Sequence, residues 1–249
     1  GTWSGDVYVN GAPRTALFKR ESAYVLQEDV HIPTLTVEET LKYAAWTRVE
    51  ENVSELVRSE RIAYLIETLG LTHVRHSRVG DAMSKGISGG QLRRLSIAVE
   101  IVALPPLIFL DEPTSGLDSS IALEVMSTVR NIINKERIGV TTIHQPSNEI
   151  FALFDKLVLM SAGRLVYFGA AAEAAAHFTQ PRLGYKFEKT GQKGNVHRNP
   201  ADFILEVCCG QSLPEGCTEP RQPQELELLY KTSPSAHRCS LSTSRLRAS

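Results

Sequence analysis

The sequence has few cysteines, and none of them is arranged for a metal site. Its 249 residues include four. They lie late in the chain, at Cys208, Cys209, Cys217 and Cys239, with no C-x-x-C pair and no histidine at the spacing of a zinc site. A chain of this length can bury a sizeable core without disulfides or a structural metal. We therefore expect reduced thiols in a cytosolic compartment.

The sequence also lacks an excess of either charge. Lys and Arg number 27 against 28 Asp and Glu, which gives a formal net charge of -1, and no block of like charges stands out. This excludes the basic field that nucleic acid or an anionic membrane surface selects. We expect no nucleic-acid partner.

Long apolar runs are missing as well. The longest nearly apolar run, residues 101–110, is about half the length of a membrane span and contains Pro105 and Pro106, so no span is predicted in this sequence. No charged and then apolar leader opens the chain, and Gly1 stands in place of an initiator Met. We expect the sequence to begin at a cut within a longer protein.

Three short runs predict β-strands, and each leads to a polar side chain. They are 23–26 before Gln27, 107–110 before Asp111-Glu112, and 139–143 before His144. The second is a continuous apolar run, which predicts a strand buried on both faces of a parallel sheet, and we expect the third to be another buried strand. An Asn10-Gly11 turn near the start and two runs at 156–160 and 165–168 predict hairpins.

Helices are predicted between these strands. Thr36 with Glu39 and Ser88 with Gln91 have the spacing of capping boxes, and Gly70 stands where a helix C-cap is expected. Apolar periodicity predicts a helix over 121–133. In the helix after Ser88 the periodicity places four residues inward and three elsewhere: Leu92, Leu95, Val99 and Val102 against Arg93, Arg94 and Glu100. Beyond Gly210 the composition is rich in Pro, Ser, Gln and Arg, and we expect weak order there.

The strand ends carry the candidate chemistry. In open α/β sheets a ligand lies beyond the carboxyl ends of the strands. The first carboxylate of Asp111-Glu112 can hold Mg²⁺, and the second can orient and deprotonate a water for in-line attack. Each residue alone has a plain structural interpretation: Asp111 caps the next loop, Glu112 is solvated, and His144 satisfies local hydrogen bonds. Their joint order and spacing favour the functional interpretation.

Two further motifs strengthen it. Ser88-Gly89-Gly90-Gln91 places paired glycines ahead of a helix, where backbone N–H groups can approach a phosphate. Ser115-Gly116-Leu117-Asp118 follows the acidic pair within a few residues.

With these motifs in order, the chain resembles the ATP-binding cassette of the ABC transporter superfamily over roughly residues 3–209. Residues 25–29 resemble its Q-loop, 86–91 its signature loop, 107–113 its Walker B strand, 115–118 its D-loop, and His144 its switch histidine. Further runs resemble the G subfamily, the White-type and pleiotropic drug resistance transporters. They are Ser4-Gly5-Asp6-Val7, residues 96–100, His144-Gln145-Pro146-Ser147 and Asn199-Pro200-Ala201-Asp202-Phe203.

The resemblance implies a role for each site residue, with ATP and Mg²⁺ as ligands. Asp111 binds Mg²⁺ and Gln27 completes the metal shell. Glu112 is the general base, and His144 contacts the γ-phosphate and the attacking water. Ser88, Gly89, Gly90 and Gln91 complete the nucleotide site of a partner cassette, and Asp118 couples the two sites.

The resemblance also implies an α/β fold with a P-loop NTPase-like, mainly parallel sheet core and an inserted α-helical signature subdomain. We expect core segments at 1–32 and 106–170, the helical subdomain at 33–105, the C-terminal part of the cassette at 171–210, and a linker or poorly ordered tail at 211–249. The implied partners are a second cassette, in a homo- or heterodimer, and a transmembrane domain. The implied location is a membrane, with the cassette on its cytoplasmic face.

One departure from the family pattern is important. No G-x-x-x-x-G-K-[ST] occurs anywhere in the sequence. In family members this Walker A loop precedes the Ser4-Gly5-Asp6 region, so we expect it upstream of Gly1 and expect weak nucleotide binding by the chain as printed. A soluble ABC ATPase of the translation-factor or DNA-repair type, and a non-catalytic cassette remnant, stay open as alternatives.

Overall fold

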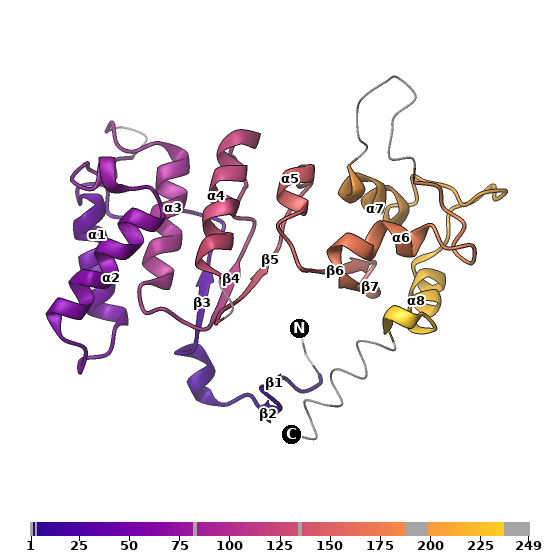
Figure 1. Ribbon diagram of the computed structural model, residues 1–249, viewed down its shortest axis with the longest axis horizontal. Coiled ribbons are helices and arrows are strands. Elements are labelled where there is room, and N and C mark those ends of the chain that lie inside the picture. The colour runs from indigo at the N-terminus through magenta and orange to yellow at the C-terminus, as the bar shows by residue number, and fades with distance from the viewer. Residues whose placement is uncertain (1, 3, 82–83, 134–135, 188–198, 237–249) are drawn as a thin grey trace. The chain divides into compact units, whose positions relative to one another are not determined.

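The computed structural model describes residues 2, 4–81, 84–133, 136–187 and 199–236 (Figure 1). Its contacts divide the chain into two compact units. One comprises residues 15–144, and the other combines 1–14 with 145–249. The division does not test the subdomain boundaries expected from the sequence, which stay a prediction.

A parallel sheet forms the middle of the 15–144 unit. It contains β3 (Ser22–Val25), β4 (Leu107–Leu110) and β5 (Ile138–Thr141), in the order β3-β4-β5. Val25 pairs with Leu110, and Leu110 pairs with Thr141. The three strands therefore end at the same level, and the residues that follow them share one edge of the sheet. This confirms the predicted α/β arrangement.

The two faces of the sheet differ in burial. Ile108 and Leu110 are buried with the core, while Leu107 and Phe109 are only partly covered. The expectation of a fully buried third strand is wrong, because Val140 of β5 is 48% exposed. Gly139, which pairs with the buried Ile108, is exposed as well, so both faces of β5 are open at this end of the described sheet.

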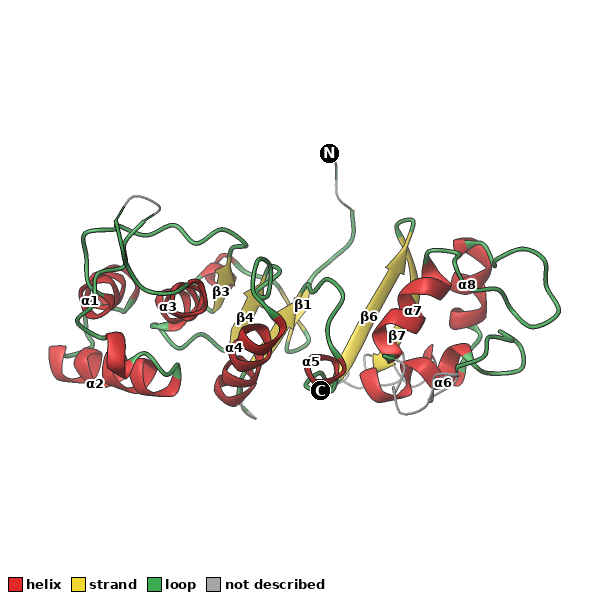
Figure 2. Ribbon diagram, turned by 90° about the horizontal axis from the view of Figure 1, so that it is seen from above, coloured by secondary structure: helices red, strands yellow, loops and turns green. Residues whose placement is uncertain are grey.

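Among the described residues of this unit, four helices and two short 3-10 turns surround the sheet. The helices are α1 (Val37–Arg48), α2 (Glu55–Thr68), α3 (Gly89–Ile101) and α4 (Ser119–Ile132), and the turns are η1 (Ala16–Lys19) and η2 (Thr72–Val74). Helix α3 lies between α1 and α4 and packs against β3 (Figures 1 and 2). The capping boxes predicted at Thr36 and Ser88 are present, and Gly70 ends α2 with a φ of +64°.

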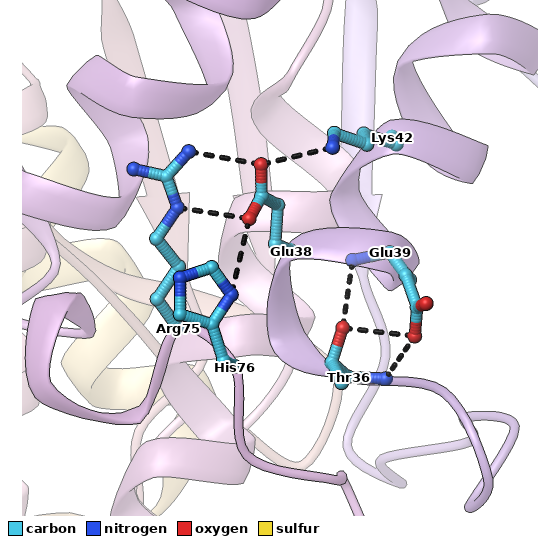
Figure 3. A network of polar contacts seen from close by, with 6 residues as sticks. All are labelled: Thr36, Glu38, Glu39, Lys42, Arg75 and His76. Carbon is cyan, nitrogen blue, oxygen red and sulfur yellow. Dashed lines mark hydrogen bonds and ion pairs between the residues drawn. The ribbon is translucent and has the colours of Figure 1, made fainter.

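Polar contacts fix the start of α1 (Figure 3). The Thr36 hydroxyl accepts from the backbone N–H of Glu39, whose carboxylate accepts from the Thr36 N–H. Glu38, the residue before Glu39, accepts two hydrogen bonds of 2.9 Å from the Arg75 guanidinium and pairs with Lys42 at 3.0 Å. The bonds from Arg75, followed by those from Lys42, lower the pKa of Glu38 to about 2. Glu38 thus stays ionised and ties α1 to the segment after η2.

The buried face of α3 corrects one prediction. Arg93 and Arg94, expected away from the core, are only 3% and 6% exposed, whereas Leu92 and Val99 are partly buried. The periodicity of apolar residues missed this face because it counts every arginine as a surface residue. Here the Arg93 guanidinium is buried among several hydrogen-bond acceptors, and that of Arg94 pairs with Glu124.

The other unit has its own core. The hairpin of β6 (Lys156–Ser161) and β7 (Arg164–Ala170) is antiparallel, as predicted, and β7 packs on α8. The remaining elements are β1 (Tyr8–Val9), β2 (Ala12–Pro13), α5 (Asn148–Phe151), η3 (Ala171–Glu173), α6 (Ala174–Phe178), α7 (Pro200–Cys208) and α8 (Pro223–Lys231). Asn10 and Gly11 make the predicted turn with φ of 50° and 79°.

Helix α8 corrects a further prediction. The expectation of weak order beyond Gly210 is wrong for residues 223–231, because Leu226 and Tyr230 are buried at helical spacing and Pro223 stands at the helix start. Residues 237–249, with Cys239, lie outside the described part of the chain. Cys208, Cys209 and Cys217 are free thiols.

The Asn-Pro-Ala-Asp-Phe motif has a structural role in this unit. The Asn199 side-chain oxygen accepts from the Ala201 N–H and so caps α7, while Nδ2 donates to the Pro146 carbonyl at 2.7 Å. The bond joins two of the motifs that carry the G-subfamily resemblance. Among the helices described, none has the length and apolar character needed to cross a membrane.

Candidate functional site at the carboxyl edge of the sheet

Asp111 begins the site, directly after β4. Its carboxylate accepts a hydrogen bond of 2.7 Å from Thr142 Oγ1 and one of 2.9 Å from the Tyr24 hydroxyl. The bond from Thr142, followed by the bond from Tyr24, lowers the pKa of Asp111 below its ordinary value. The hydrogen bond to Asp111 raises the pKa of Tyr24 above its ordinary value. Asp111 is therefore an anion at neutral pH, aimed by neighbours on both adjacent strands.

Glu112 sits in an unusual backbone conformation. Its φ is 41°, in the left-handed region that non-glycine residues rarely adopt. Its N–H donates to Thr142 Oγ1 at 3.0 Å, and its Oε2 accepts from Gln27 Nε2 at 2.8 Å. Such conformations cost about 1–3 kcal/mol and persist where the surroundings fix them, commonly at functional sites. The Glu112 carboxylate is thus held beside Gln27.

Gln27 reaches the site from the loop after β3. Besides Glu112, its amide donates to Ser115 Oγ at 3.4 Å. The structure therefore brings together Gln27, Asp111 and Glu112, as the strand ends predicted. Both hydrogen bonds described for the side-chain amide use Nε2, which leaves the side-chain oxygen Oε1 of Gln27 available to a ligand.

His144 is not drawn into this cluster. Its ring is exposed, and within the described residues no hydrogen bond or ion pair joins it to Asp111 or Glu112. Its assignment as switch histidine stays a prediction.

The Ser88-Gly89-Gly90-Gln91 motif forms the N-terminus of α3. Ser88 caps the helix by accepting from the Gln91 N–H, and Gln91 Oε1 accepts from the Ser88 N–H at 2.8 Å. The Gln91 side-chain nitrogen lies 2.9 Å from Nε2 of His73, in the turn η2. Ser88 and Gly89 are exposed at this helix end. The exposed end can receive a phosphate from outside the chain.

Gly90 is required by packing. A Cβ at this position would lie 2.4 Å from Cγ2 of Ile121 on α4, whereas one at Gly89 would meet only Leu117 Cδ2 at 4.0 Å. Gly90 therefore sets the close approach of α3 to α4.

Asp118 has a local role that the structure describes fully. Its Oδ1 accepts from the N–H groups of Ser120 and Ile121 at 3.0 Å, which caps α4. Coupling to a second site stays a prediction for this residue.

Sequence reasoning missed Tyr24, Thr142 and Arg93. Strand register could have found Thr142, because Thr141 pairs with Leu110 and the next residues on the two strands are Thr142 and Asp111. Tyr24 precedes Val25, which pairs with Leu110, so register places it near the same edge. No pattern marked Arg93.

The donors at this edge suit a hard cation. Asp111 is ionised, and Gln27 and Glu112 supply further oxygen atoms. In the described part of the chain no three His, Cys, Asp or Glu side chains gather as a complete metal cage. Mg²⁺ commonly takes one or two carboxylates, with waters and phosphates as the other ligands, so the residues present fit it.

The fold and this edge match the arrangement expected of an ATP-binding cassette, and sequence comparison agrees. The family model described as ABC transporter matches residues 2–115. The chain is also 42% identical over 231 residues to the broad substrate specificity ATP-binding cassette transporter ABCG2 of Sus scrofa, covering 89% of this chain and 34% of that protein. The chain belongs to the ABC transporter family.

Its relatives place it more closely, among G-family members. It is 38% identical over 242 residues to ABC transporter G family member 14 of Arabidopsis thaliana, covering 97% of this chain and 36% of that protein. It is 41% identical over 212 residues to ABC transporter G family member 24 of Dictyostelium discoideum, covering 83% of this chain and 18% of that protein. The chain spans about a third or less of the length of these relatives.

Proposed function

We propose that the chain is part of the nucleotide-binding domain of a G-family transporter, which couples ATP binding and hydrolysis to the export of a substrate across a membrane. The observation that carries this proposal is the cluster of Gln27, Asp111 and Glu112 at the carboxyl edge of the sheet. Gln27 follows β3, and Asp111 and Glu112 follow the neighbouring strand β4. Phosphoryl transfer needs a metal ligand and a base brought together in this way.

Asp111 and Gln27 hold Mg²⁺ in this proposal. Hydrogen bonds from Thr142 and Tyr24 keep the Asp111 carboxylate ionised and oriented. When bound, Mg²⁺ neutralises charge on the phosphates and thereby assists in-line displacement.

Glu112 is the general base. Its carboxylate accepts the proton of the attacking water, and the Gln27 amide holds Oε2 in place by a 2.8 Å hydrogen bond. The position of Glu112 follows from its fixed backbone, with φ of 41° and the N–H bonded to Thr142. His144, which is exposed at the end of β5, contacts the γ-phosphate and the water in this proposal.

The signature residues act on a partner. Ser88, Gly89, Gly90 and Gln91 stand at an exposed helix N-terminus, where backbone N–H groups attract anions. We therefore assign them to the nucleotide site of a second cassette in a homo- or heterodimer, with Asp118 coupling the two sites. A transmembrane domain is the other partner, and the cassette lies on the cytoplasmic face of the membrane.

The missing G-x-x-x-x-G-K-[ST] motif favours a second candidate, a non-catalytic cassette that only dimerises. The two functions differ in whether the chain hydrolyses ATP once a phosphate-binding loop is supplied. The loop and its lysine cradle the β- and γ-phosphates.

The test compares the printed chain with the same chain joined to the strand, phosphate-binding loop and helix that precede this region in a G-family relative. We expect very weak MgATP binding and background hydrolysis for the chain alone, and binding with turnover for the joined protein. A joined protein with the loop lysine changed to alanine is the control. Substantial hydrolysis by the chain alone would refute the site assignment, and binding without turnover in the joined protein would favour the non-catalytic candidate.

A further inference from the structure

Arg93 is a buried cation at the point where α3 meets the two strand ends. Arg93 is only 3% exposed. The guanidinium donates to five acceptors: Nη1 to the carbonyl oxygens of Leu26 and Gln27 and to the carboxylate of Asp29, Nη2 to the Asp111 carbonyl, and Nε to the Pro113 carbonyl. The donor–acceptor distances run from 2.6 Å for Leu26 to 3.1 Å for Gln27, Asp111 and Pro113.

The acceptors surround the site residues along the chain. Leu26 and Gln27 present their carbonyls from the loop after β3, and the carbonyls of Asp111 and Pro113 stand on either side of Glu112. The left-handed conformation of Glu112 needs surroundings that fix it. Arg93 fixes this backbone on both sides of Glu112, because it donates to the carbonyl oxygens of Asp111 and Pro113.

Only arginine can make this set of contacts. Its planar fork carries five N–H donors, so one side chain can serve acceptors on two loops. A lysine ammonium carries three donors at a single point. Burying a cation is costly unless it is paired and hydrogen-bonded, and Asp29 pairs with Arg93 at 2.9 Å.

We propose that Arg93 is a positioning residue for hydrolysis: it couples the position of the signature helix α3 to the backbone that holds Gln27 and Glu112. The N-terminus of α3 carries Ser88 and Gly89, so a nucleotide received there acts through the helix on the general base of this chain. The role in hydrolysis rests on the proposed function. The link that the Arg93 hydrogen bonds make between α3 and the backbone around Gln27 and Glu112 does not rest on it.

Arg94 provides a matched control. It is the next residue of the same helix and is 6% exposed. Its guanidinium pairs with Glu124 of α4, and within the described residues no hydrogen bond or ion pair joins it to the strand ends. Arg93→Met and Arg94→Met each remove one buried cation from α3, but only the first removes the link to Gln27 and Glu112.

The first measurement is amide hydrogen exchange in the chain as printed, where no nucleotide is needed. The Glu112 N–H bonds Thr142 Oγ1 and the Asp111 N–H bonds the Val25 carbonyl. We expect Arg93→Met to speed exchange at these two amides by about tenfold or more relative to amides of α2, and Arg94→Met to leave them unchanged. Equal effects of the two substitutions, or none, would overturn the link.

The second measurement is steady-state ATP hydrolysis by the joined protein described above. We expect Arg93→Met to lower kcat by about 10²-fold with KM for ATP changed less than about threefold, because a displaced base slows chemistry more than binding. Arg93→Lys restores only part of kcat. A loss confined to KM, or an equal loss in Arg94→Met, would overturn the positioning role.

The two measurements separate this inference from the function on which it rests. Failure of the unsubstituted joined protein to hydrolyse ATP would count against the proposed function, and exchange would still decide the link. Should Arg93→Met fail to fold, Arg93→Lys replaces it in both measurements. It must then show the faster exchange and the lower kcat, or the inference is wrong.

Discussion

The side-chain amide of Gln27 lies 2.8 Å from the carboxylate of Glu112, measured from Nε2 to Oε2, although 85 positions separate them in the sequence. Parallel pairing of β3 with β4 creates this contact, because Val25 and Leu110 are partners at the ends of the two strands. Movement of the loop after β3 would therefore displace the Gln27 amide and alter the hydrogen bond that it donates to Glu112.

A side chain at Gly90 would disturb the contact between α3 and α4. We expect Gly90→Ala to lower the free energy of unfolding by about 1–3 kcal/mol, because its Cβ would lie 2.4 Å from Ile121 Cγ2. Gly89→Ala should cost less than about 1 kcal/mol, since its nearest neighbour stands at 4.0 Å. Urea unfolding measures both.

The partner of this clash supplies the control. Ile121→Ala removes Cγ2, so the double variant with Gly90→Ala should be more stable than the sum of the two single changes predicts, by about 1 kcal/mol or more. Simple additivity would show that the Gly90 effect has another cause.

We expect His177 to make the stability of the unit formed by residues 1–14 and 145–249 depend on pH. It is 2% exposed, and within the described residues both ring nitrogens lack a hydrogen-bond partner. Burial, followed by the charge of Arg182, lowers its pKa from 6.5 to about 4. The unfolded chain therefore binds a proton at this histidine more readily than the folded chain does. The stability that neutral His177 contributes is complete above about pH 6.5, and up to about 3 kcal/mol of the free energy of unfolding is lost as the pH falls to about 4.

The measurement is denaturant unfolding of the chain at a series of pH values between 7.5 and 4. Other groups also titrate in this range, so His177→Leu isolates the effect: the leucine variant should lose less stability on acidification than the parent chain. Parallel curves for the two proteins would exclude His177 as the source.

Ser88 should matter to a partner more than to its own chain. In the joined protein, we expect Ser88→Arg to abolish ATP-dependent dimerisation and to leave nucleotide binding by the monomer nearly intact, because the serine stands at the exposed N-terminus of α3. Light scattering with and without ATP measures the first effect, and equilibrium binding measures the second.

Ser54→Arg controls for the lost helix cap. Ser54 caps α2 by accepting from the Val57 N–H, as Ser88 caps α3, and either loss costs about 1 kcal/mol. Dimerisation should survive Ser54→Arg. Equal loss of dimerisation and binding in Ser88→Arg would contradict the composite site.

Much of the site could be predicted because strand ends and caps leave local signals. The strand-like runs before Gln27 and Asp111 predict that these residues share one edge of the sheet. The capping-box spacings predict the helix starts at Thr36 and Ser88. Arg93 left no such signal, since its burial depends on carbonyl groups that only the folded chain brings together.

Burial was predicted less well than element type. The sequence predicts a buried strand at 139–143, but the observed strand, 138–141, lies at the end of the described sheet and is largely exposed. Helix α8 was missed because the polar composition of the region concealed a short amphipathic repeat, in which Leu226 and Tyr230 contact the core.

The central claim is that Glu112 is the general base of an ATPase site, and single-turnover hydrolysis by the joined protein tests it most directly. Glu112→Gln keeps the size of the side chain and removes its ability to take a proton. We expect the rate to fall by about 10² to 10⁴ while ATP still binds and the dimer stays closed. An unchanged rate in Glu112→Gln would contradict the account.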